Sequence, residues 1–358
     1  MLYDDAVMVA IEGHEAEDRL LRWAAEEAHD RRRPLVVVHV WEWSPASHDV
    51  QVVGVNDVAD VRTLAHLLRY DSTYGRYPGR VEVDGEALVV DGARIRVTAE
   101  PDPAQLDWAA VGADVVVEST GRFRTRDDAA LHLKAGARKV VLSAPGKGVE
   151  ATLVLGVNTD DYDPDRHDIV SNASCTTNCV APMVKVLHEA FGLRQGFLTT
   201  VHGYTNDQNL LDGPHKDLHR ARAAAVNVIP TTTGAARAVG LVLPEVAGRL
   251  DGLALRVPVE DGSLCDLAAV LEREVTADEV NAAFRAAAVA GPLAGLLSYN
   301  EDPIVSRDVI GDPSSCVYDA TLTQASGELV KVFGWYDNEW GYTQRLLDLV
   351  QLVGTRLE

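Results

Sequence analysis

Nine small and polar residues, Ser171–Cys179, separate a strand-like segment from a helical one and constrain this sequence more than any other feature. A strand-like run precedes them at Asp168–Val170, and a helical pattern follows over Val180–His188. Cys175 is therefore predicted at or near a helix N-terminus, where unpaired N–H groups and the helix dipole favour an anion. We expect this position to lower the pKa of the thiol and to make a nucleophilic thiolate available. The alternative is a buried structural cysteine, the usual role of a lone cysteine.

Strand-like and helical patterns alternate before Cys175, which is typical of a doubly wound α/β domain. We expect strands at Val7–Ile11, Leu35–Val40, Gln51–Val55, Val115–Val117 and Lys139–Leu142. We expect helices at Ala16–His29, Ala59–Leu68 and Arg126–Ala135. After Cys175 the segments are longer and more apolar, which predicts a mixed sheet with helices on one face. A last helix is predicted at Tyr342–Leu352.

The composition describes a soluble globular protein. A length of 358 residues predicts two domains, and the mean hydropathy is −0.05. There is no apolar run of about 18 residues, so no membrane span is expected. The acidic start, Met1–Asp5, lacks the basic residues of a signal peptide, and we expect a cytoplasmic location.

Charge and cysteine content exclude two further classes. A net charge of −21 argues against binding to nucleic acid, which needs clustered Lys and Arg. The cysteines are too few and too scattered for a disulfide framework or a zinc site, so no metal is expected. They are Cys175, Cys179, Cys265 and Cys316.

From about Val50 to the C-terminus, the sequence resembles the phosphorylating glyceraldehyde-3-phosphate dehydrogenases. The resemblance rests on Ser-Cys-Thr-Thr-Asn-Cys at 174–179 and on further motifs in the same order. These motifs are Val55–Asp57, Glu118–Gly121, Leu142–Pro145, Thr200–Thr205, Ile229–Ala236, Leu255–Pro258 and Trp335–Tyr342. The resemblance implies a Rossmann-like NAD-binding domain, an α+β catalytic domain with a mixed sheet, and a homotetramer.

The domain boundaries follow from the same resemblance. We expect an atypical N-terminal β-α-β segment at 1–49 and the remainder of the NAD-binding domain at 50–174. The catalytic domain is expected at 175–336, and a C-terminal helix at 337–358 is expected to return to the NAD-binding domain.

The N-terminal segment departs from the family pattern. In the family, the first strand leads into a Gly-x-Gly-x-x-Gly turn that holds the cofactor pyrophosphate on helix N–H groups. Here only Gly13 remains of the three glycines, and Glu15 and Asp18 stand at the other two positions. A carboxylate repels the pyrophosphate and a Cβ atom obstructs the approach of the backbone, so we expect a weakened cofactor site.

Residues 7–43 instead resemble the opening β-α-β unit of a universal stress protein domain, most clearly at 21–28 and 35–41. The glycine-rich ATP loop of that family is absent, so a working stress-protein module is not expected. The segment either supplies a surrogate first strand and helix or adds an extra strand, and both alternatives stay open.

The resemblance implies a chemistry for two residues. The Cys175 thiolate would attack the aldehyde carbon of the substrate, and His202 would take the hydroxyl proton as a base. Oxidation by NAD would leave a thioester, which inorganic phosphate would cleave to an acyl phosphate. An imidazolium at His202 would also stabilise the thiolate.

The resemblance also implies two phosphate sites, which need cationic and hydroxyl donors. The substrate phosphate would bind Arg256 and Thr205. The attacking phosphate would bind Ser174, Thr176, Thr233, Gly234 and Arg220. Arg222 lies on the same segment as Arg220, and either arginine fits this role.

Cofactor contacts are implied at several strand ends. Asp57 ends a strand-like segment, and an acidic residue there accepts bonds from ribose hydroxyls and repels a 2′-phosphate, which favours NAD over NADP. The other cofactor residues implied are Thr120, Gly121, Ser143, Asn338 and Tyr342. Asn338 would orient the nicotinamide carboxamide.

The leading hypothesis is an NAD-dependent glyceraldehyde-3-phosphate dehydrogenase with a weakened pyrophosphate site. The alternatives are a catalytically deficient homologue, acting as a thiol redox sensor or phosphometabolite-binding protein, and a chimeric or truncated product whose first domain folds badly. Erythrose 4-phosphate is a second candidate substrate, although the full phosphate set favours the triose. No residue indicates whether the working direction is glycolytic or gluconeogenic.

Overall fold

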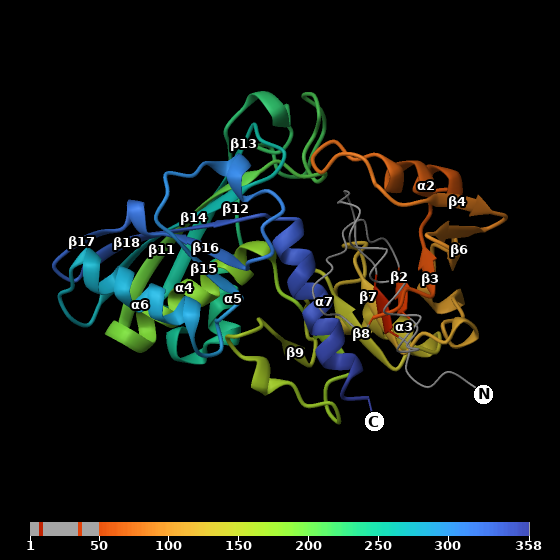
Figure 1. The fold of residues 1–358 in the computed structure, drawn as a ribbon, viewed down its shortest axis with the longest axis horizontal. Coiled ribbons are helices and arrows are strands. Elements are labelled where there is room, and N and C mark those ends of the chain that lie inside the picture. The colour runs from red at the N-terminus through yellow and green to blue at the C-terminus, as the bar shows by residue number, and fades with distance from the viewer. Residues whose placement is uncertain (1–6, 10–34, 38–49, 358) are drawn as a thin grey trace. The chain divides into compact units, whose positions relative to one another are not determined.

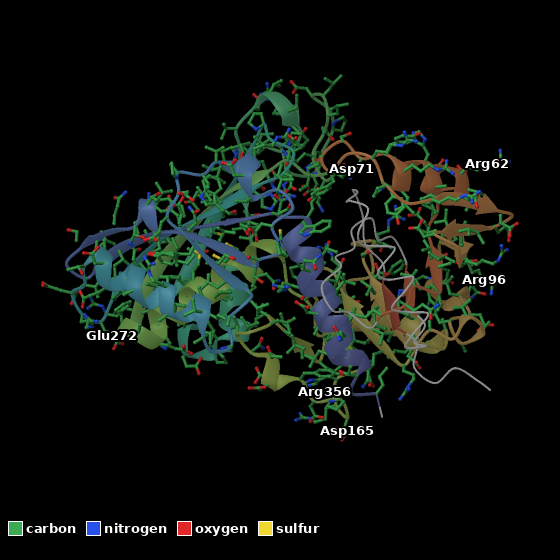
Figure 2. The ribbon with its side chains drawn as sticks, viewed as in Figure 1. Arg62, Asp71, Arg96, Asp165, Glu272 and Arg356 are labelled. Carbon is green, nitrogen blue, oxygen red and sulfur yellow. The ribbon has the colours of Figure 1, made fainter. Side chains whose placement is uncertain are left out.

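The computed structural model describes residues 7–9, 35–37 and 50–357, which form two compact units (Figure 1). The first unit comprises the described residues up to Leu153 and from Thr343 onward, together with Asp160–Ala173. The second comprises Val154–Thr159 and Ser174–Tyr342. Charged side chains such as Arg62, Arg96 and Glu272 are exposed (Figure 2).

The first unit contains a parallel sheet of six strands in the order β2-β1-β7-β8-β10-β9. Its strands are β1 (Val7–Val9), β2 (Leu35–Val37), β7 (Val115–Glu118), β8 (Lys139–Leu142), β9 (Ala151–Thr152) and β10 (Ile169–Ser171). Every residue of β7, β8 and β10 is buried, as expected for central strands of a parallel sheet. Helix α3 (Arg126–Lys134) packs against β8 and is capped by the Thr125 side chain.

The first unit also contains a smaller sheet of four strands, in the order β3-β6-β5-β4. These strands are β3 (Gly54–Asn56), β4 (Val81–Asp84), β5 (Ala87–Val90) and β6 (Ala93–Thr98). Helix α2 (Val61–Arg69) begins after Asp60, whose side chain accepts hydrogen bonds from two backbone N–H groups of the first turn. Leu64 and Ala65 are its buried residues, and the helix packs against β4.

The second unit contains a mixed sheet of eight strands, in the order β12-β13-β11-β14-β18-β16-β15 with β17 paired to β18. The strands are β11 (Leu193–Gly203), β12 (Ile229–Thr232), β13 (Leu250–Val257), β14 (Ser263–Leu271), β15 (Leu297–Asn300), β16 (Cys316–Asp319), β17 (Gln324–Ser326) and β18 (Leu329–Tyr336). The helices are α4 (Cys175–Phe191), α5 (Ala235–Val242) and α6 (Ala277–Val289), and they lie on the same side of this sheet (Figure 1). Helix α7 (Trp340–Gly354) continues from the second unit into the segment that belongs to the first.

Helix α4 is the core helix of the second unit. It is buried on nearly all sides because it packs against the sheet, α5 and α6. Gly334 of β18 permits this close approach, since a Cβ atom there would lie 2.8 Å from Met183 Sδ and 2.6 Å from Cys316 Sγ.

Short 3₁₀ helices connect the larger elements. They are η1 (Pro103–Gln105), η2 (Ala109–Val111), η3 (Thr159–Asp161), η4 (Ala224–Val226), η5 (Pro244–Val246), η6 (Ser306–Val309) and η7 (Ala320–Leu322). Among the described helices, none combines the length and the apolar character that a membrane crossing requires.

The α/β class and the mixed second sheet are confirmed, and several element ends need correction. The predicted helix Ala59–Leu68 begins at Val61 because Asp60 caps it, and the helix predicted at Tyr342–Leu352 extends over Trp340–Gly354. The strand predicted at Gln51–Val55 is observed at Gly54–Asn56. Only Val7–Val9 and Leu35–Val37 are described in the N-terminal segment, so the predicted helix Ala16–His29 and the Gly13 turn lie outside the described residues.

Candidate active site

Cys175 is the first residue of α4, and His202 lies near the end of β11. Ser174 is the helix N-cap, and its side chain accepts a hydrogen bond of 3.1 Å from the Thr177 N–H group. The predicted helix N-terminus at Cys175 is therefore confirmed. The Nε2 atom of His202 lies 3.4 Å from the Sγ atom of Cys175, within reach of a proton transfer.

Burial shifts the pKa values of this pair away from those expected of an ion pair. Burial raises the pKa of Cys175 to about 11, although the guanidinium of Arg256 acts in the opposite direction. Burial, and then the charge of Arg256, lower the pKa of His202 to about 3. The expectation of a lowered thiol pKa was wrong here, because loss of water outweighs the helix N-terminus.

Arg256 is the neighbour of His202 in the sheet. The two residues are paired across the parallel strands β11 and β13. The Arg256 Nη1 atom lies 2.6 Å from His202 Nδ1 and donates a hydrogen bond of 2.9 Å to the Gly203 carbonyl oxygen. Tyr336 packs its ring edge against the His202 ring, with the ring centres 5.9 Å apart.

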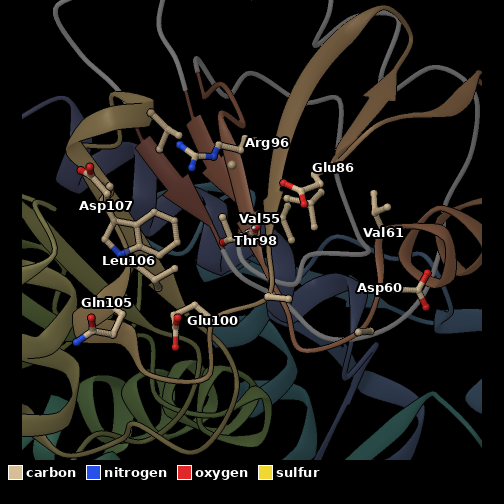
Figure 3. A pocket seen from close by; sticks show the side chains of 16 residues that line it. Val55, Asp60, Val61, Glu86, Arg96, Thr98, Glu100, Gln105, Leu106 and Asp107 are labelled. Atoms are coloured by element: carbon tan, nitrogen blue, oxygen red, sulfur yellow. Dashed lines mark hydrogen bonds between the residues drawn. The ribbon is translucent and has the colours of Figure 1, made fainter.

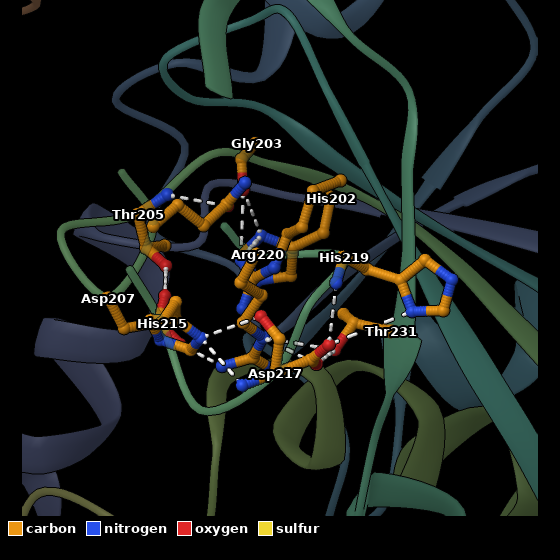
Figure 4. A network of polar contacts seen from close by, with 11 residues as sticks. His202, Gly203, Thr205, Asp207, His215, Asp217, His219, Arg220 and Thr231 are labelled. Atoms are coloured by element: carbon orange, nitrogen blue, oxygen red, sulfur yellow. Dashed lines mark hydrogen bonds and ion pairs between the residues drawn. The ribbon is translucent and has the colours of Figure 1, made fainter. Parts of the chain in front are cut away.

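The segment after β11 forms a polar network around Asp207 (Figure 4). The Thr205 hydroxyl donates to one oxygen of the Asp207 carboxylate, and Arg220 forms an ion pair with the other. Arg220 Nε also donates to Thr231 Oγ1 at 3.0 Å, and that hydroxyl donates to Asp217 at 3.0 Å. Two residues predicted to bind phosphate, Thr205 and Arg220, therefore contact the same carboxylate.

Arg222, the alternative to Arg220, takes a different direction. Its Nε atom donates to Asp212 at 3.0 Å, and its side chain is exposed. The structure therefore brings Arg220, and not Arg222, into the Asp207 network.

Apart from Arg220, the residues predicted to bind the attacking phosphate lie at two helix N-termini. Ser174 caps α4 and Gly234 caps α5, and these two helices pack together. Thr233 accepts a hydrogen bond of 3.2 Å from the Ala235 N–H group. Thr176 is buried, and its hydroxyl forms a hydrogen bond of 2.9 Å with Tyr336 Oη. Helix N-termini favour anions, which suits a phosphate.

In the first unit, Asp57 and Thr120 line one pocket of about 250 Å³. Asp57 is 8% exposed and follows β3, and its Oδ1 atom accepts a hydrogen bond of 2.7 Å from the Ala59 N–H group. Thr120 follows β7. Gly121 adopts a left-handed conformation with φ of 68°, and the Ser143 N–H group donates to the Glu118 carbonyl oxygen at 3.0 Å. Neither of these last two residues lines the pocket.

A buried chain of side chains, which the sequence analysis missed, holds Thr120 in place. Glu118 Oε1 accepts a hydrogen bond of 2.7 Å from the Thr120 N–H group. Glu118 Oε2 lies 3.0 Å from His132 Nε2, and His132 Nδ1 accepts a bond of 3.1 Å from Trp108 Nε1. His132 therefore carries its proton on Nε2 and donates it to Glu118.

Another pocket of the first unit, of about 530 Å³, contains none of the predicted cofactor residues (Figure 3). Side chains of β3, β6 and the start of α2 surround it, including Val55, Arg96 and Asp60. We assign no ligand to it.

Asn338 and Tyr342, the remaining predicted cofactor residues, lie in the second unit. The Ser263 hydroxyl donates to Asn338 Oδ1 and accepts a bond of 3.2 Å from the Gly203 N–H group. Because its oxygen is engaged, the Asn338 amide presents its N–H groups as donors. Ser263 is a further residue that the sequence analysis missed. Tyr342 lies in the first turn of α7 and is partly exposed.

Comparison with known families decides what this chain is related to. Residues 35–126 match the model of the glyceraldehyde 3-phosphate dehydrogenase NAD binding domain, and residues 174–338 match the model of the C-terminal domain of the same enzyme. The chain belongs to the glyceraldehyde-3-phosphate dehydrogenase family.

Individual members of the glyceraldehyde-3-phosphate dehydrogenase family are similar over most of their length. The enzyme of Streptomyces coelicolor is 56% identical over 310 residues, which cover 86% of this chain and 92% of the relative. The enzyme of Geobacillus stearothermophilus is 58% identical over 309 residues, with the same shares covered. The glyceraldehyde-3-phosphate dehydrogenase 1 of Bacillus subtilis is 55% identical over 309 residues.

Proposed function

We propose that this protein is an NAD-dependent, phosphorylating glyceraldehyde-3-phosphate dehydrogenase. It converts glyceraldehyde 3-phosphate, NAD and inorganic phosphate to 1,3-bisphosphoglycerate and NADH. The observation that carries this proposal is the contact of 3.4 Å between Cys175 and His202, at the start of a helix, in a member of this family.

In this proposal, Cys175 is the nucleophile. His202 takes the thiol proton of Cys175, the thiolate attacks the aldehyde carbon, and the resulting oxyanion takes that proton back to give a thiohemiacetal. His202 then takes the hydroxyl proton as the carbon is oxidised. NAD, when bound, accepts the hydrogen and the two electrons that leave this carbon. The resulting thioester is attacked by an oxygen of inorganic phosphate, and Cys175 leaves as a thiolate.

Cationic and hydroxyl groups of the second unit bind the two phosphates. Arg256 and Thr205 serve the substrate phosphate. Ser174, Thr176, Thr233, Gly234 and Arg220 serve the attacking phosphate. The Asp207 carboxylate, which contacts Thr205 and Arg220 in this structure, occupies donors that a phosphate needs. A bound phosphate therefore competes with Asp207 for these groups.

The residues of the first unit fit an adenine dinucleotide. Asp57 is an acidic residue at a strand end and faces a pocket, so it can accept bonds from ribose hydroxyls and repel a 2′-phosphate. Thr120, Gly121 and Ser143 follow β7 and β8 and complete this set. Asn338 donates to the nicotinamide carboxamide, with Tyr342 as a further contact.

We place the enzyme in the cytoplasm as a homotetramer. Support for an assembly comes from several large apolar side chains that are exposed within the segment 204–228. They are Leu210, Leu211, Leu218, Val226 and Val228. A monomer rarely exposes so many in one segment, so we infer that a second copy covers them.

Several finer assignments belong to the same proposal. The domain ends are those expected above, with the catalytic domain at 175–336 and a returning helix at 337–358. The likeness of residues 7–43 to a universal stress protein falls mostly outside the described residues and stays a hypothesis.

As the substrate of this enzyme, glyceraldehyde 3-phosphate is preferred to erythrose 4-phosphate. The family matches give no support to a redox sensor that has lost dehydrogenase activity.

Calorimetric titration of NAD into the purified protein tests the proposal where the sequence departs most from the family pattern. Micromolar binding is expected if the N-terminal segment still allows a dinucleotide site. Absence of binding at millimolar NAD, in a folded protein, would contradict an NAD-dependent reaction.

A further inference from the structure

The carboxylate of Asp207 contacts donors from both proposed phosphate sites at once (Figure 4). One of its oxygens accepts a hydrogen bond from the hydroxyl of Thr205, which is proposed to bind the substrate phosphate. The other oxygen pairs with Nη1 of Arg220, which is proposed to bind the attacking phosphate. One side chain therefore links two groups that the proposed reaction uses for different anions.

Arg256, the other ligand proposed for the substrate phosphate, also responds to this carboxylate. Burial lowers the pKa of Arg256, and the charge of Asp207 acts in the opposite direction because it stabilises the guanidinium. Asp217 lies 3.6 Å from Arg220 and adds a second negative charge. The two arginines and the two aspartates therefore have no net formal charge, so together they attract a phosphate only weakly.

A carboxylate makes the same kinds of contact as a phosphate. Both are anions whose oxygens accept hydrogen bonds from guanidinium and hydroxyl groups. A phosphate that binds Thr205 or Arg220 must therefore displace the Asp207 carboxylate or lie beside a charge of the same sign. Displacement and repulsion both weaken the binding of the phosphate.

The two donors are held in place by contacts other than those with Asp207. Arg220 Nε donates a hydrogen bond of 3.0 Å to Thr231 Oγ1. The N–H group of Thr205 donates to Gln208 Oε1 at 3.2 Å, and its carbonyl oxygen accepts a bond of 3.0 Å from the Gln208 N–H group. We therefore expect both donors to keep their positions when Asp207 moves away or loses its charge.

Asp207 itself is free to rotate towards water. Its side chain is 47% exposed, and it lies within the turn that the hydrogen bond between Thr205 and Gln208 closes. A displaced carboxylate can therefore be hydrated without a change in the backbone of this turn, and it can return when the donors become vacant.

We propose that Asp207 is an internal competitor for both phosphates. It occupies donors of each site when the site is empty, lowers the affinity of the protein for each phosphate, and returns to the donors as a phosphate leaves. The identity of the two phosphates rests on the proposed function.

This role of Asp207 matters most for the product. An acyl phosphate that also carries the phosphate ester of the substrate has one phosphoryl group for each site. As either group loosens, Asp207 competes for the donor that becomes vacant, and it repels the group that is still bound. We therefore expect Asp207 to speed the release of a product that the donors alone would hold tightly.

The test is a titration of inorganic phosphate into the purified protein, followed by phosphorus NMR without NAD or aldehyde. Asp207→Asn keeps the shape of the side chain and an oxygen that can accept from Thr205, but it removes the charge. The dissociation constant for phosphate should fall by about three- to fivefold, the range set by the loss of one exposed ion pair. A second titration with glycerol 3-phosphate, which has no aldehyde, should change in the same direction.

Asp212→Asn is the matched control, because Asp212 pairs with the exposed Arg222 outside the Asp207 network. It removes an equal charge from the same segment and should leave the dissociation constant within about 1.5-fold, since solvent screens exposed charges. The double variant Asp207→Asn/Arg220→Ala should lose most of the gain, which identifies the site that the phosphate occupies.

An unchanged or higher dissociation constant in Asp207→Asn would overturn the proposal, and so would an equal fall in Asp212→Asn. If Asp207→Asn does not fold, Asp207→Ser removes the same charge and has the same expected result. Tighter phosphate binding by Asp207→Asn, in a protein without dehydrogenase activity, would remove the proposed function and leave this inference in place. Absence of phosphate binding in both the unmodified protein and Asp207→Asn would overturn this proposal and the two phosphate sites together.

Discussion

The Nε2 atom of His202 lies 3.4 Å from the Sγ atom of Cys175, although 27 positions separate the two residues in the sequence. One comes from the start of α4 and the other from the end of β11, two elements that pack together in the second unit. Each side chain is anchored by its own element. Either one can therefore be changed while the other keeps its place.

His202→Gln should slow the formation of the acyl-enzyme by about 10²–10⁴-fold, the range for the loss of a general base. A stopped-flow measurement of the first turnover of NADH formation reports this step. His66→Gln is the control, since His66 is an exposed residue of α2 and should leave the burst unchanged. An unchanged burst in His202→Gln would remove this residue from the mechanism.

Arg220→Ala and Arg222→Ala form a matched pair on one segment. Arg220 shares Asp207 with Thr205, whereas Arg222 pairs with Asp212. Arg220→Ala should raise the KM for inorganic phosphate by about tenfold, equivalent to ~1.4 kcal/mol. Arg222→Ala should leave it within about twofold. Steady-state kinetics with varied phosphate decides this, and the reverse order of effects would show that the wrong arginine has been assigned.

Asp57→Ala should weaken NAD binding at least about tenfold and reduce the preference for NAD over NADP. Asp60→Ala is its control, because Asp60 is an exposed helix cap three positions away. Loss of this cap should lower the free energy of unfolding by about 1 kcal/mol without a change in NAD affinity. Calorimetry and thermal unfolding of both variants provide the comparison. Equal NAD affinity in Asp57→Ala and the unmodified protein would contradict the cofactor assignment.

A buried pair of carboxyl groups predicts a pH dependence of stability. Burial, and then the charge of Asp261, raise the pKa of Asp337 well above its usual value of 3.8. A carboxyl whose pKa is higher in the folded state contributes its stability at low pH and loses it as the pH rises through that raised pKa. The protein should therefore lose stability as the pH rises from about 4 towards the raised pKa.

Asp261→Asn should reduce this loss and raise the melting temperature at neutral pH, because it removes one of two neighbouring carboxyl charges. The asparagine oxygen can still accept the bond of 2.7 Å from the Gly262 N–H group. Asp251→Asn is the control, since Asp251 makes the same local bond to Gly252 at an exposed position. Melting curves between about pH 5 and 8 measure the effect, and parallel curves for both variants would argue against a coupled pair.

Local patterns predicted the strands and helices that carry the site, while partners distant in the sequence remained unknown. The strand Lys139–Leu142 was correct to the residue, and the start of α4 near Cys175 followed from the small polar residues that precede the helical pattern Val180–His188. The contact between His202 and Arg256 depends on the register of β11 against β13, which no local pattern indicates. For the same reason Ser263 was not recognised as the partner of Asn338.

The direction in which the pKa of Cys175 shifts could also not be predicted from the sequence. A helix N-terminus lowers the pKa of a thiol, and this was the basis for expecting a thiolate at Cys175. Burial within the second unit acts in the opposite direction and raises the pKa of Cys175 to about 11. Burial is a property of the whole unit, so it cannot be obtained from the residues around Cys175 alone.

We propose above all that this protein oxidises a phosphorylated aldehyde with NAD through a covalent intermediate on Cys175. The most direct test is an assay of NADH formation by the purified protein with glyceraldehyde 3-phosphate, NAD and inorganic phosphate. We predict sustained NADH formation that requires all three compounds and disappears in Cys175→Ser while the fold is retained. The contradicting result would be no NADH from the folded protein, or undiminished NADH formation in Cys175→Ser.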